Sequence, residues 1–101
     1  MRHFIEIVEP VEVTGQYNEL EKTWEVKSEA WADIIDSESD FQFVLDGELV
    51  SANKVIKIRY TDDLKEGDGI KQNGKIYRIA NTENEKEMNR YLILYLVNYH
   101  G

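Results

Sequence analysis

The chain has 101 residues, of which twenty are acidic and twelve basic, giving a formal net charge of −8. This length is that of one ordinary domain, and an apolar fraction of 42% indicates a folded protein, not a disordered one. The acidic balance argues against free nucleic acid as the main ligand, because phosphate contacts draw on lysine and arginine. The absence of cysteine excludes a disulfide framework and any thiolate nucleophile or metal site.

The N-terminal third is predicted to form strands. Residues 3–8 alternate as a first strand, and Pro10 is expected at its end or on a sheet edge. A turn is predicted at residues 15–19. Two further strands are expected at residues 23–27 and 30–36, the second with Trp31 on one face and Ala32 on the other.

Residues 37–53, SESDFQFVLDGELVSAN, carry four acids, no base and several apolar side chains. We interpret this segment as a long excursion, either a short helix or a hairpin that turns at Asp46-Gly47. Loops of this length in compact domains are usually functional or disordered. The segment is too apolar for a plain linker, so we expect it to dock on another surface.

The C-terminal half is also predicted to be sheet. A strand is expected at residues 54–60, followed by a turn at 66–69. Asn73-Gly74 is a strong signal for a type I′ hairpin turn, which needs positive φ at both central residues. Residues 76–80 then form the return strand. The last strand, residues 91–99, is apolar on both faces, so it is expected to be central or covered on each side.

About seven strands with regular turn signals predict an all-β fold, a small β-barrel or sandwich, with one long loop between the third and fourth strands. Residues 1–101 are expected to form a single domain. Residues 1–8 lack the apolar core of a signal peptide, and no run approaches the ~20 apolar residues of a membrane span. We therefore expect a soluble protein with no membrane partner, made in the cytoplasm.

No constellation of catalytic residues is found in the sequence. His3 and His100 lie near opposite ends, and Asp62-Asp63 sits where a strand ends, which favours a turn-capping role over a metal site. The serines have no nearby histidine and no glycine-rich elbow. We expect no enzyme activity, no catalytic or metal-binding residue and no cofactor.

The aromatic residues are candidates for core or interface packing rather than for base stacking. These candidate core or interface residues are Trp24, Trp31, Tyr60, Tyr77 and Tyr95.

Five short runs occur in a characteristic order along the chain. The runs are Glu21-Lys22-Thr23-Trp24-Glu25-Val26, Ala30-Trp31-Ala32-Asp33-Ile34, Ile56-Lys57-Ile58-Arg59-Tyr60, Asn73-Gly74-Lys75-Ile76-Tyr77-Arg78-Ile79 and Arg90-Tyr91-Leu92-Ile93-Leu94. No single run is specific, but their order and spacing, from about residue 4 to residue 97, resemble one known family: the phage head–tail joining proteins, also called head–tail adaptors, head-completion or head-closure (stopper) proteins.

The resemblance implies a structural protein of the virion, located at the head–tail interface and made in the bacterial host cytoplasm. Such a protein forms a homo-oligomeric ring on the portal or adaptor protein, while the free chain can be a monomer. The ring closes the DNA-filled head without sequence-specific DNA binding and receives the tail or a tail-terminator protein.

In some members of the family the long loop projects into the central channel, and here it corresponds to residues 37–53. This segment is more acidic and apolar than is typical of the family. The candidate channel or gating residues are Asp40, Phe41, Phe43, Asp46, Gly47 and Glu48. The alternative for this segment is a lid over one end of the barrel. For the whole chain, the alternatives are a tail terminator or tail-completion protein, and a small β-barrel that binds another protein.

Overall fold

The computed structural model describes residues 1–98. Tyr99, expected in the last strand, and His100 lie outside the described residues. The strands are β1 (His3–Thr14), β2 (Leu20–Asp36), β3 (Phe41–Leu45), β4 (Glu48–Ala52), β5 (Lys54–Arg59), β6 (Gly69–Gln72), β7 (Lys75–Asn84) and β8 (Tyr91–Asn98), with a short 3-10 turn η1 (Glu85–Glu87) before β8.

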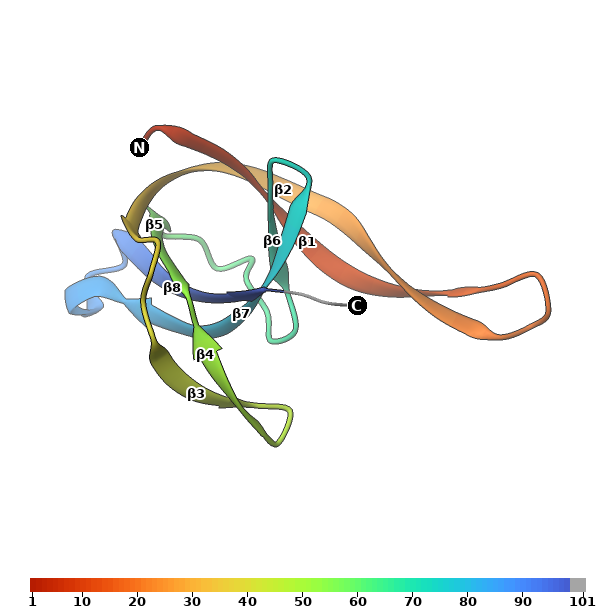
Figure 1. The fold of residues 1–101 in the computed structure, drawn as a ribbon. Helices are drawn as coiled ribbons and strands as arrows, with labels where there is room; N and C mark the ends of the chain where they lie inside the picture. The colour runs from red at the N-terminus through yellow and green to blue at the C-terminus, as the bar shows by residue number, and fades with distance from the viewer. Residues whose placement is uncertain (99–101) are drawn as a thin grey trace.

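Six of these strands close into a barrel in the order β1-β2-β5-β8-β7-β6, and every neighbouring pair is antiparallel (Figure 1). The remaining strands, β3 and β4, pair only with each other, as a separate hairpin. The prediction of an all-β barrel is confirmed. Closure suits so small a domain because it leaves no unpaired edge in the barrel wall.

The described residues contain eight strands where about seven were expected. The segments 23–27 and 30–36, expected as separate strands, belong to the single strand β2. Residues 41–52 form a hairpin, not a loop or helix, because Asp46 and Gly47 adopt φ values of 53° and 80°, as a type I′ turn requires. Asn73 and Gly74 make the predicted turn between β6 and β7, with φ values of 51° and 78°.

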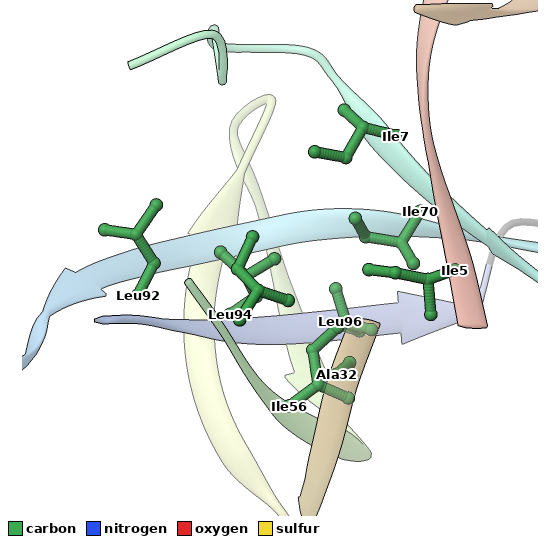
Figure 2. Packing of buried hydrophobic residues seen from close by; sticks show 9 residues of the cluster. Ile5, Ile7, Ala32, Ile56, Ile70, Leu92, Leu94 and Leu96 are labelled. Carbon is green, nitrogen blue, oxygen red and sulfur yellow. The ribbon is translucent and has the colours of Figure 1, made fainter. Parts of the chain in front are cut away.

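The barrel interior is filled by branched aliphatic side chains from alternate positions of its strands (Figure 2). A register shift between Ile7 and Val8 allows both of these neighbours to be buried. The core cluster comprises Ile5, Ile7, Ala32, Ile56, Ile58, Ile70, Leu92, Leu94 and Leu96.

The loop before β6 is fixed to the barrel by a buried ion pair. The Lys27 Nζ lies 2.5 Å from the Asp68 Oδ2, and the Asp68 side chain is only 4% exposed. The same carboxylate accepts the Lys65 N–H at 2.8 Å, and Lys27 also donates to the carbonyl of Asp63 at 2.5 Å. This arrangement joins residues 63–68 to β2, where β2 leaves the barrel.

The β1–β2 hairpin extends well beyond the barrel and is here called the arm (residues 9–25; Figure 1). β6 pairs with β1 only as far as Val8, and β5 pairs with β2 only from Ala32 onward. The ladder from Glu9↔Glu25 to Thr14↔Leu20 therefore has no third strand beside it. Six pairs at about 3.3 Å per residue span roughly 20 Å, in line with molecular extents of 48 × 28 × 24 Å.

Within residues 1–98, no helix has the length and apolar character needed to cross a membrane.

Candidate docking surfaces

The β3–β4 hairpin packs on the outside of the barrel through an aromatic cluster. The rings of Phe41 and Phe43 lie 5.3 Å and 5.1 Å from the ring of Tyr95 on β8, both in tilted or edge-on geometry. Such pairs stabilise a contact by about 0.5–1.5 kcal/mol beyond the area that they bury. The outer face of β8, predicted to be covered, is thus covered in part by the chain's own hairpin.

Tyr95 also anchors this contact through its hydroxyl, which donates to the Glu83 carboxylate at 2.9 Å. Burial, and then the hydrogen bond and negative charge of Glu83, raise the pKa of Tyr95 above its usual value of 10.0. The phenol therefore stays protonated, as the hydrogen bond requires, at any ordinary pH.

The predicted gating residues fall into two groups in the structure. Phe41 and Phe43 contact the barrel as described, whereas Asp40 and Glu48 are exposed. Asp46, at the turn, has an Oδ2 2.5 Å from the Arg78 Nη2 on β7, so the tip is also held to the barrel. Gly47 completes that turn.

The other face of the β3–β4 hairpin points away from the barrel and carries two apolar side chains, Val44 and Leu49, beside Gln42 and Ser51. Val44 and Leu49 are directly opposed across the two strands and are 70% and 67% exposed. Large apolar side chains paired on a free face favour a surface that another subunit covers.

The predicted core or interface aromatics are distributed over the molecule. Trp24 is half-buried at the base of the arm, and a Cβ added at Gly69 would lie 3.2 Å from its ring, so Gly69 allows this close approach. Trp31 is 56% exposed and stacks edge-on with the exposed Phe4 at 5.7 Å. Tyr60 is 40% exposed. Tyr77 is half-buried, with the Lys54 Nζ 5.0 Å from its ring centroid.

The arm is a surface of which the sequence predicted the turn, at residues 15–19, but not the length of the two strands. Its turn is ordered, because the Gly15 N–H donates to the Glu19 carbonyl at 2.7 Å and the Tyr17 N–H donates to the Glu19 carboxylate at 2.8 Å. Tyr17 and Leu20 are nonetheless 82% and 72% exposed. The available signal was the pair of β-prone stretches flanking this turn.

Asp33 and Asp63 make ordinary structural contacts. Asp33 lies 3.1 Å from the N-terminal ammonium, and the Asp63 N–H donates to the Thr61 hydroxyl at 3.2 Å. Among residues 1–98, no three histidine or acidic side chains gather in a way that would hold a metal ion.

A small closed barrel that carries two hairpins, each with exposed apolar side chains, has the architecture of a structural protein that docks on other subunits. The comparison with known families agrees: the family of phage head completion proteins matches residues 1–97. The chain belongs to this family, and so to the structural proteins of the phage head.

Several chains of solved structures share the fold. A chain of the virion of a native gene transfer agent particle superposes with a TM-score of 0.62 at 17% identity, covering 97% of this chain and 96% of that one. Protein SF1141 from Shigella flexneri 2a gives a TM-score of 0.65 at 19% identity, covering 99% and 94%. At these identities the likeness concerns the fold alone. No curated protein matches the chain.

Proposed function

We propose that this protein is a head–tail connector that forms a ring below the portal or its adaptor, closes the DNA-filled head and offers a platform to the tail. The observation that carries the proposal is the family match over almost the whole chain. The two hairpins supply separate surfaces, one for neighbouring subunits and one for the channel or for partners above and below the ring. The protein acts by assembly and carries out no covalent chemistry.

Within this function, the β3–β4 hairpin lines or gates the channel. The aromatic contact with Tyr95 and the Asp46–Arg78 ion pair fix its orientation on the barrel. Asp40 and Glu48 remain exposed, with no ion pair to any described residue. An acidic lining repels phosphate, so DNA can pass or be held back without adhering to the protein.

DNA-filled heads assembled without this protein provide the test. Purified protein is added, and the DNA that stays protected from nuclease is followed over time. Protection should rise and saturate at a fixed number of bound copies per head. Unchanged leakage with no protein co-sedimenting with heads would contradict the head-side role, and binding to isolated tails instead would assign the protein to the tail.

A double variant tests the gating role separately from head binding. Asp40→Lys with Glu48→Lys reverses the exposed charges of the β3–β4 hairpin and leaves Phe41 and Phe43 on the barrel. We expect this double variant to bind heads as the wild type does but to change the rate at which DNA leaves them, because DNA then adheres to the channel wall. If DNA release is unchanged, these carboxylates do not line the channel, although the ring can still close the head.

A further inference from the structure

The arm and the groove beside Phe4 and Trp31 are complementary surfaces at opposite ends of one β-ladder. We propose that the arm of each copy of this chain inserts its tip into this groove of a neighbouring copy, so that each subunit contacts the next one through two different surfaces. The inference rests on the proposed ring function and names the contact that builds the ring.

The arm presents both charge and apolar surface to a partner. Residues 9–25 contain five glutamates and a single lysine. Three of these glutamates, Glu12, Glu19 and Glu21, lie in the outer half of the arm, where Lys22 is the single base. The exposed Tyr17 and Leu20 stand at the tip. A partner that is both basic and apolar would offset this negative charge and cover these two side chains.

The chain itself provides such a surface near the start of β1. A groove of about 510 Å³ runs between the Phe4–Trp31 pair and the β6–β7 turn, and Arg2 and Lys71 are among the residues that line it. Phe4 and Trp31 are 44% and 56% exposed. The single acid in its lining is Glu6, which pairs across the strands with Lys71.

Two more lysines extend this basic surface. The Lys54 Nζ donates to the Gln72 side chain at 2.6 Å, and Gln72 also lines the groove. Lys75 pairs with Gln72 across the turn and is exposed. Basic side chains therefore cluster here on a chain whose net charge is −8, which makes an acidic protein segment the complementary ligand.

The arm cannot reach the groove of its own chain. The ladder that begins near Phe4↔Trp31 ends at Thr14↔Leu20, ten residues further along β1, or roughly 30 Å at about 3.3 Å per residue. Figure 1 shows the chain's N-terminus and the arm's tip at opposite ends of the ladder. Contact between two different surfaces of identical subunits is heterologous, and such contacts close into rings or extend into filaments.

The edges of the arm offer a second means of attachment. Along residues 9–14 of β1 and the facing part of β2, the outer backbone groups have no strand beside them. Pro10 removes one donor from the β1 edge, whereas β2 has no proline in this stretch. The β2 edge is thus the better template for pairing with a neighbouring chain.

Disulfide trapping tests the contact directly, because the chain has no cysteine of its own. A chain carrying both Tyr17→Cys and Phe4→Cys should give a ladder of oxidised oligomers, on heads and in concentrated protein. Either single variant should stay monomeric under the same conditions. A dimer from Tyr17→Cys alone would reveal an arm-to-arm contact and overturn the proposal. The proposal would also be wrong if the double variant formed no ladder either on heads or in concentrated protein.

Charge exchange gives an independent test with a distinctive signature. Glu12→Lys with Glu21→Lys reverses the charge of the outer half of the arm, and Arg2→Glu with Lys75→Glu reverses the charge of the groove. Each double variant alone should lose at least tenfold in copies bound per head. A mixture of the two should regain binding, because each interface then joins opposite charges. The matched control, Lys65→Glu with Lys86→Glu, makes the same charge change on exposed lysines that line neither the arm nor the groove.

The outcomes separate this inference from the ring function. If the reversed-groove variant binds heads, protects DNA and still forms the disulfide ladder, the proposed contact is wrong and the connector role stands. If wild-type protein does not bind heads at all, the connector role fails, while a ladder in concentrated protein still establishes the arm–groove contact. If the wild type binds single-stranded DNA and the double variant Arg2→Glu with Lys75→Glu does not, the groove is a nucleic-acid site and the proposed contact is wrong.

Discussion

At the scale of single residues, turn chemistry could be predicted from sequence and tertiary partners could not. Asn73-Gly74 and Asp46-Gly47 turn the chain where their tolerance of positive φ indicates. Asp68, in contrast, occurs in an acidic stretch that looks like a solvated turn but is buried. Its partner, Lys27, lies on a strand far away in the sequence, so no local pattern predicts the ion pair.

The Asp68 ion pair yields a stability prediction. Asp68→Ala leaves the largely buried Lys27 ammonium without its carboxylate, and breaking a buried pair in this way costs about 3–5 kcal/mol. We expect urea unfolding to show a fall in the free energy of unfolding near the lower limit of this range, because Lys27 keeps its bond to the Asp63 carbonyl.

The control for this prediction is Asp62→Ala, which removes an exposed carboxylate and should change the free energy of unfolding by no more than about 0.5 kcal/mol. Lys27→Met with Asp68→Leu should recover part of the loss, because no unpaired charge then remains. Equal stability of Asp68→Ala and the wild type would mean that the pair is not formed in solution.

At the scale of elements, residues 37–53 show how far the sequence could lead. Their apolar content predicted docking, and the hairpin that turns at Asp46-Gly47 was one of the two forms considered. The docking surface itself, around Tyr95, is set by the packing of distant strands and has no signature within the segment. The arm was predicted only in part: its turn at residues 15–19 and the strand from residue 23 were expected, whereas the strand residues 9–14 and 20–22 were not. These residues contribute nothing to the core cluster.

Docking of the β3–β4 hairpin can be tested separately from barrel stability. Phe43→Ala removes one ring that packs on Tyr95, and we expect amide exchange in residues 41–52 to become about tenfold faster, since about 1.4 kcal/mol corresponds to a factor of ten. Exchange in β5 and β8 should not change. Val44→Ala, on the exposed face of the same strand, is the matched control. A uniform increase over the whole chain would show that the hairpin and barrel unfold as one unit.

At the scale of the whole molecule, the strand composition was predictable and the closure of the barrel was not. Alternation and turn signals identified most of the strands. The order β1-β2-β5-β8-β7-β6 depends on β1 pairing with β6, a contact between residues more than sixty positions apart. Neither this closure nor the length of the arm follows from a pattern within any one segment.

The arm also determines the overall dimensions, which allows a final prediction. The radius of gyration is 14.1 Å, whereas a compact domain of this length has about 13 Å. Replacing residues 12–22 by Asn-Gly closes the ladder at Val11↔Thr23 with a two-residue turn. Small-angle scattering should then give roughly 12 Å.

The thermal midpoint of this shortened chain should stay within about 4 °C of the wild type, because the excised residues bury no core side chain and Trp24 is kept. Head binding should be lost if the arm joins neighbouring subunits. A large fall in the midpoint would instead make the arm part of the folding unit. Intact barrel stability with lost assembly would separate the two roles of one continuous β-ladder: its first half builds the barrel wall and its second half reaches the next subunit.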